Sequence, residues 1–220
     1  MAAVAAVLVV IASRTLASDI RLWLPFLYIG AGYWIPVLLV APTHGGRFEV
    51  WLRQSDAAAR RFAVAMPPWL AAAMEIGYLS CFPLVPVAFG AMWDAGSTAD
   101  VERFWTAVLA AAFASYGPLP WLVSRPPRLL EDAPQSPRGS VARANVFVLG
   151  RVSHNLNTFP SGHVAVATAA AIAVGAVWPA AGAALGVVAM MIAIGAVAGG
   201  YHYVADVVLG AIVGAAATLI

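Results

Sequence analysis

Long uninterrupted runs of apolar residues alternate with short polar links along most of the chain. Several runs reach the ~20 residues that a helix needs to cross a bilayer, and they lack the polar–apolar alternation of a half-buried strand. The pattern therefore predicts an all-α fold, a polytopic transmembrane helical bundle with about six spans. The predicted spans are residues 22–41, 63–93, 104–123, 164–178, 180–199 and 204–220.

Two apolar regions depart from a simple span. Residues 2–12 are short for a crossing and lack the basic start and the cleavage site of a secretory signal. They either lie in the membrane interface or extend through Arg14, whose side chain would snorkel to the membrane surface. The sequence leaves both arrangements of the N-terminal helix open. Residues 63–93 form one long or tilted span interrupted by four prolines. Glu75 lies inside that span, and we expect its carboxylate to find hydrogen-bond partners within the bundle.

Composition supports a membrane protein. The chain is 62% hydrophobic and 10% charged, whereas a soluble domain carries about 25% charged residues. A net charge of +2 gives no reason to expect nucleic acid, and the single Cys81 excludes an internal disulfide. We expect one membrane-embedded domain over residues 1–220. All twelve basic residues are arginine, the residue whose guanidinium fork suits phosphate and carboxylate.

The polar link at residues 43–61 mixes aromatic and basic side chains. Phe48 and Trp51 lie next to Arg47 and Arg53, which predicts an amphipathic helix on the membrane surface.

Counting crossings brings several polar segments to one membrane face. From the polar segment at 124–160 one span leads away, the chain turns at Pro179, and the next span returns near Gly199. The residues after Gly199 are therefore back on the starting face. That face would hold residues 43–61, 124–128, 160–163 and 202–206.

The residue types in these segments suit phosphate chemistry. Ser161 and Gly162 open a helix, where free backbone N–H groups favour an anion. Arg125 and Arg128 can grip phosphate oxygens through charge-assisted hydrogen bonds. We therefore predict an anion site at this face.

Two histidines and an aspartate add a catalytic possibility. His202 and Asp206 are four residues apart and share one helical face, so the carboxylate can orient the imidazole and stabilise its charged form. With His163 at the same face, one histidine can attack phosphorus while the other protonates the departing oxygen.

At these residues the chain resembles the type 2 phosphatidic acid phosphatase superfamily. That family includes membrane lipid phosphatases, lipid phosphotransferases, soluble acid phosphatases and vanadium haloperoxidases. Its Pro-Ser-Gly-His signature matches Pro160 to His163, its His-x-x-x-Asp matches His202 to Asp206, and the Arg-Pro of its first signature matches Arg125 and Pro126. The motifs lie within residues 121–214.

The resemblance implies a role for each matching residue. His202 would be the nucleophile that forms a phosphohistidine, Asp206 would orient it, and His163 would be the general acid. No metal and no other cofactor are expected. The phosphoryl oxygens would be bound by Ser161, Gly162 and Arg125.

Two cations of the family pattern are missing. Pro118 stands where the first signature has lysine, and Gly195 and Ala196 stand where the third signature has a serine-arginine pair. The negative charge of the transition state still needs donors. We expect them from Arg128 and Arg151, with Arg143 as a further candidate. The Arg-Pro-Pro-Arg sequence is similar to the branch related to inositol phosphorylceramide synthases.

Three functions follow from the resemblance. The first is an integral membrane phosphatase acting on a lipid phosphate, such as a polyprenyl or phosphatidyl phosphate. The second is a lipid phosphotransferase with an alcohol as acceptor, and the third is a non-catalytic relative. The cell membrane is the expected location. Because the 43–61 link holds four arginines and the 94–103 link is acidic, the positive-inside rule favours a cytoplasmic active face.

Overall fold

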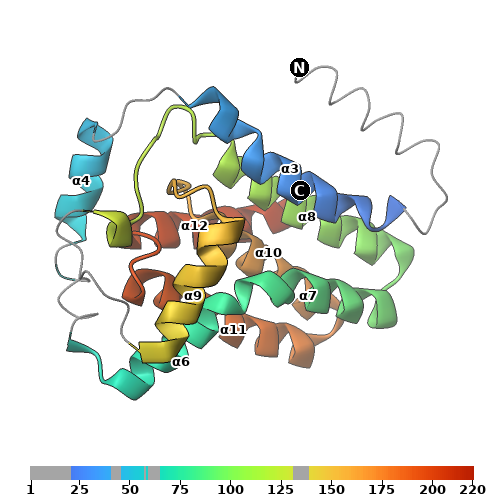
Figure 1. The fold of residues 1–220 in the computed structure, drawn as a ribbon. Coiled ribbons are helices and arrows are strands. Elements are labelled where there is room, and N and C mark those ends of the chain that lie inside the picture. Colours follow the sequence, from blue (N-terminus) through green and yellow to red (C-terminus); the bar gives the residue numbers. More distant parts are fainter. Residues whose placement is uncertain (1–20, 41–45, 57, 59–64, 131–138) are drawn as a thin grey trace.

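The chain folds into a bundle of helices, drawn in Figure 1. The computed structural model describes residues 21–40, 46–56, 58, 65–130 and 139–220, so the N-terminal piece at 2–12 lies outside the described residues. The prediction of an all-α fold is confirmed, since the regular elements within those ranges are helices. They are α3 (Leu24–Trp34), α4 (Arg47–Ser55), α6 (Pro68–Leu79), α7 (Cys81–Ala95), α8 (Thr98–Tyr116), α9 (Gly139–Val152), α10 (Gly162–Val177), α11 (Pro179–Ala198), α12 (Val204–Ala216) and the short 3-10 helices η1 (Pro36–Leu39), η2 (Pro127–Leu129) and η3 (Ala217–Leu219).

Helix α10 is the centre of the bundle and packs against α7, α8, α11 and α12. Its small residues Ala165, Ala169 and Ala170 are fully buried, so neighbouring backbones can approach closely. One close approach joins α10 to α11, where a Cβ atom added to Gly182 would lie 2.2 Å from the Cα atom of Gly175.

This contact predicts a difference between two glycines of α11. Gly182→Ala is expected to lower stability by about 1–3 kcal/mol, because the new methyl group meets backbone that cannot move aside. Gly186→Ala is the control, since a Cβ there meets nothing within 4 Å. Thermal unfolding in detergent would measure both, and equal melting temperatures would contradict the packing.

The predicted 63–93 span is two helices, α6 and α7, which meet at Ser80 with a bend of 54°. Pro83 explains the position of the break: it has no N–H to donate to the Leu79 carbonyl, and its ring opposes a continuous helix. In the first turn of a new helix the missing N–H costs little. Pro68 begins α6 in the same way, whereas Pro86 lies inside α7.

Helix α11 is long and apolar enough to cross a membrane, and α6 with α7 passes the same test if the bent pair is one span. Other apolar helices among the described residues are shorter, so six spans remain a prediction. Only 33% of the apolar stretch of α11 is buried inside the bundle. Val187, Met190 and Ile194 form an exposed apolar face on it, as a helix in contact with lipid would.

Helix α9 was not predicted, because the 124–160 segment is rich in proline and arginine. It packs against α6, where the Asn145 side chain donates to the backbone oxygen of Glu75 at 2.9 Å and also to its carboxylate. The Tyr201 hydroxyl donates to the same carboxylate at 2.6 Å. Glu75 is therefore satisfied within the bundle, as expected.

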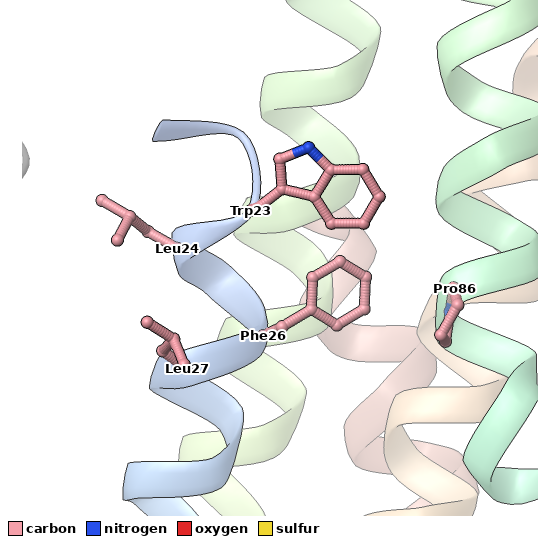
Figure 2. A pocket seen from close by; sticks show the side chains of 5 residues that line it. All are labelled: Trp23, Leu24, Phe26, Leu27 and Pro86. Atoms are coloured by element: carbon pink, nitrogen blue, oxygen red, sulfur yellow. The ribbon is translucent and has the colours of Figure 1, made fainter. Parts of the chain in front are cut away.

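An open apolar pocket lies between α3 and α7. Figure 2 shows Trp23 and Phe26 on the side of α3 that faces Pro86 of α7, with Leu24 and Leu27 pointing away. All five lining residues are apolar, so this pocket offers no group for acid–base or nucleophilic chemistry.

Candidate functional site

A small polar pocket brings the two predicted catalytic histidines together. His163 is the second residue of α10, His202 lies between α11 and α12, and their ring centroids are 5.9 Å apart. Both rings line the pocket. The other lining residues are Tyr33, Tyr78, Pro126, Arg128, Leu149, Ser153, Leu156, Thr158 and Tyr201.

A tight turn after α11 positions His202. Gly200 has a positive φ of 67°, which glycine adopts without strain. The chain then folds back, and the backbone N–H groups of Tyr201 and His202 both donate to the Ala196 oxygen, at 2.8 and 3.0 Å. The small residue at position 196, where the family has a cation, is thus buried under the turn that carries the histidine.

Asp206 fixes the orientation of the His202 ring. Its Oδ2 atom lies 3.1 Å from Nδ1 of His202, and its side chain is fully buried in the first turn of α12. Since Nδ1 faces the carboxylate, Nε2 is the ring nitrogen left for a ligand. The backbone oxygen of Asp206 also accepts from the Ser161 N–H at 2.9 Å, which joins the start of α10 to α12.

Arg128 brings a positive charge with available donors to the pocket. Its backbone N–H donates to Gly200, and its guanidinium lies over the Tyr201 ring, 4.7 Å from the centroid. Its Nε and Nη1 atoms are buried without a hydrogen-bond partner. A cation held by an aromatic face keeps its N–H donors available, so Arg128 is suited to bind an oxyanion.

The other three predicted arginines, Arg125, Arg143 and Arg151, lie outside the pocket lining, and Arg143 is exposed on α9. Arg125 pairs with Glu49 of α4, through Nη2 to Oε1 at 2.9 Å and Nε to Oε2 at 3.3 Å. Arg151 is exposed, lies over the Phe147 ring at 3.4 Å, and donates to the Phe147 oxygen.

Ser161 and Gly162 lie at the start of α10 but do not line the pocket. Ser161 is fully buried, and the Gly162 N–H lies 3.4 Å from the Thr158 hydroxyl. A Cβ atom on Gly162 would lie 2.2 Å from a ring atom of Tyr116. Their predicted contacts with phosphate therefore stay predictions, and the structure gives both residues a packing role.

His154 lies beside the pocket, where its ring stacks on Tyr33 with a centroid distance of 4.2 Å. Burial lowers its pKa to about 4, so this ring is neutral at physiological pH. Within the part of the chain that the structure describes, no group of three His, Cys, Asp or Glu side chains is placed to hold a metal ion. A site without metal remains an expectation.

The pocket thus combines an oriented imidazole, a second imidazole and a guanidinium with free donors. A model described as the PAP2 superfamily matches residues 103–220, more than half of the chain. The chain belongs to the PAP2 superfamily. Comparisons with curated proteins and with solved structures gave no match. The similarity to the inositol phosphorylceramide synthase branch stays a prediction.

PAP2 phosphatases and phosphotransferases act on phosphate esters, and PAP2 proteins are generally membrane proteins. The matched region contains His163, His202, Asp206 and Arg128. Helices α3, α4, α6 and α7 precede it, so the PAP2 match says nothing about the side chains that they bring to the site.

Sequence reasoning missed two residues that line the pocket, Tyr78 and Tyr201, and one outside it, Glu49. Tyr201 and Tyr78 stack with centroids 4.1 Å apart and support the guanidinium of Arg128. Glu49 binds Arg125. Tyr201 had a signal, since it directly precedes His202 in the sequence; Glu49 had only its acidic character within a basic amphipathic helix.

Proposed function

We propose that this PAP2 protein is an integral membrane phosphatase that hydrolyses a lipid phosphate through a phosphohistidine on His202. The observation that carries the proposal is the single pocket shared by His163, His202 and Arg128, with the imidazole centroids 5.9 Å apart and two guanidinium nitrogens unpartnered.

The proposed reaction has two steps. Nε2 of His202 attacks phosphorus while His163 gives a proton to the departing alcohol oxygen, which leaves a phosphohistidine. His163 then accepts a proton from water, which attacks phosphorus and releases inorganic phosphate and free His202. Asp206 holds the nucleophile and stabilises its positive charge, and Arg128 stabilises the negative charge that builds on the phosphoryl oxygens.

A lipid substrate fits the apolar surroundings. The exposed apolar face of α11 supports a bundle embedded in lipid, and polar groups gather where α10 and α12 begin. A substrate with a phosphate head and an apolar tail can leave its tail in the bilayer while the head enters the pocket.

Phosphate release and covalent trapping test the proposal together. Purified protein in nanodiscs is given labelled phosphatidic acid, a polyprenyl phosphate and a polyprenyl diphosphate, with and without an alcohol acceptor. We expect free phosphate from at least one lipid and a label on His202 that is acid-labile and base-stable, as an N–P bond requires. In sealed right-side-out vesicles, a cytoplasmic active face predicts phosphate release into the lumen and not into the medium.

Each alternative predicts a different result. Label transferred to the added alcohol with little free phosphate would make the protein a phosphotransferase. No release and no protein-bound label from any lipid would contradict both enzymatic functions and favour a non-catalytic relative.

A further inference from the structure

Helix α4 buries an acidic side chain against the loop that carries the two arginines. Glu49 is only 2% exposed. Its Oε2 atom accepts from the backbone N–H of Arg125 at 2.9 Å as well as from Nε, and Oε1 accepts from Nη2. One carboxylate therefore holds both the side chain and the backbone of Arg125.

The loop from Ser124 to Arg128 lies between the two histidine segments, which are the residues leading into α10 with His163 and the turn between α11 and α12 with His202. The Ser124 oxygen accepts from the Asn157 N–H at 2.8 Å, close to the start of α10. The Arg125 oxygen accepts from the Tyr203 hydroxyl at 3.0 Å, next to His202. Arg128 donates to Gly200 at 2.9 Å. A shift of this loop would move Arg128 relative to both imidazoles.

Helix α4 also contacts the two histidine segments directly. Oδ1 of Asp56, just after α4, accepts from the Val204 N–H at 2.8 Å and so caps α12, the helix that holds Asp206. The rings of Phe48 and Phe159 meet edge-to-face at 5.0 Å, one residue before Pro160. A helix outside the matched PAP2 region thus touches all three segments of the site.

We propose that Glu49 is a positioning residue: it fixes Arg125, and through it the loop from Ser124 to Arg128, so that Arg128 faces His163 and His202. This inference rests on the proposed function. It makes Arg125 a structural partner of Glu49 instead of the phosphate ligand that the family resemblance implies.

The electrostatics agree with a permanent pair. Burial raises the pKa of the Glu49 carboxyl, but hydrogen bonds from the Arg125 side chain and backbone outweigh it, and the pKa lies below its usual value. Glu49 is therefore charged at neutral pH. Removing one member of a buried pair leaves the other charge uncompensated, so either single substitution should release the loop.

A double-mutant cycle tests the proposal. Glu49→Gln, Arg125→Gln and the double variant are compared with wild type in kcat, KM and inhibition by orthovanadate, an oxyanion shaped like phosphate. We expect each single variant to lose about 10- to 100-fold in kcat/KM, because misplacing a binding group by about 1 Å has effects of this size. The double variant should be no worse than either single one.

The vanadate inhibition constant should rise in parallel, since Arg128 would no longer face the oxyanion. Glu49→Asp keeps the charge with a shorter reach and should recover part of the activity. Glu102→Gln, on an exposed position of α8, is the matched control and should behave as wild type. If Glu49→Gln does not fold, Glu49→Asp and Arg125→Lys are measured instead, and both should raise the inhibition constant for orthovanadate.

Three results would overturn the inference. Tighter vanadate binding by Glu49→Gln would mean that Glu49 holds Arg125 back from phosphate. Additive losses would mean that Glu49 and Arg125 act independently of each other. A lower melting temperature with unchanged kcat/KM and vanadate inhibition would give the pair a purely structural role. A wild-type protein with neither turnover nor vanadate binding would instead contradict the proposed function.

Discussion

His202→Ala is expected to abolish phosphate release, lowering kcat/KM by about 10⁴-fold or more. The variant removes the imidazole that a buried carboxylate orients in the pocket, with Nδ1 at 3.1 Å from Asp206. Without it no phosphohistidine can form at this position, so the protein-bound label should vanish. Initial rates on the preferred lipid phosphate and acid-labile label on the protein measure both effects.

His163→Ala separates the two imidazoles. If His163 protonates the leaving oxygen, its loss should cost about 10²–10⁴-fold on a lipid phosphate. The loss should be far smaller on p-nitrophenyl phosphate, whose leaving group needs no proton. His202→Ala should be inactive on both substrates, and His154→Ala, which lies outside the pocket lining, should stay close to wild type. Equal losses for His163→Ala on both substrates would contradict the assigned roles.

The meeting of His163 and His202 follows from features that a sequence carries. Helices α10 and α11 separate them, and two consecutive antiparallel helices return the chain to the side from which it started. The i,i+4 spacing likewise predicts that His202 and Asp206 can touch, although His202 lies just before α12 and the contact also needs the Gly200 turn. The helical class followed from apolar runs that lack strand alternation.

Other features depend on contacts that spacing does not encode. Arg125 and Arg128 are separated by two prolines and look equivalent in the sequence. They differ because a carboxylate 76 residues away accepts from the backbone N–H, Nε and Nη2 of Arg125, whereas Arg128 lies over an aromatic ring. Helix α9 was not predicted because the 124–160 segment is rich in proline and arginine, and spacing does not encode its contact with α6 through Asn145 and Glu75.

Arg128→Ala is expected to lower kcat/KM by about 10²–10³-fold, the usual cost of removing a donor to a developing oxyanion. The guanidinium lies over Tyr201, which stacks on Tyr78 and donates its hydroxyl to Glu75. This aromatic contact holds the guanidinium by its face, and Nε and Nη1 have no hydrogen-bond partner. Orthovanadate should bind the variant more weakly by a similar factor.

Arg128→Lys discriminates charge from geometry. Lysine keeps the positive charge but has no planar fork and stacks less well on an aromatic ring, so it should recover only a small part of the lost activity. Full recovery would mean that a point charge is sufficient and that the support from Tyr201 is incidental.

Arg151→Ala is the matched control for Arg128. Its guanidinium also lies over an aromatic ring, that of Phe147, but it is exposed and outside the pocket lining. We expect near wild-type activity from it. A PAP2 site that lacks two of its usual cations has fewer donors to stabilise the negative charge on the phosphoryl oxygens. The kcat/KM of Arg128→Ala should therefore be at least about tenfold lower than that of Arg151→Ala. Equal losses would place the phosphate away from Arg128.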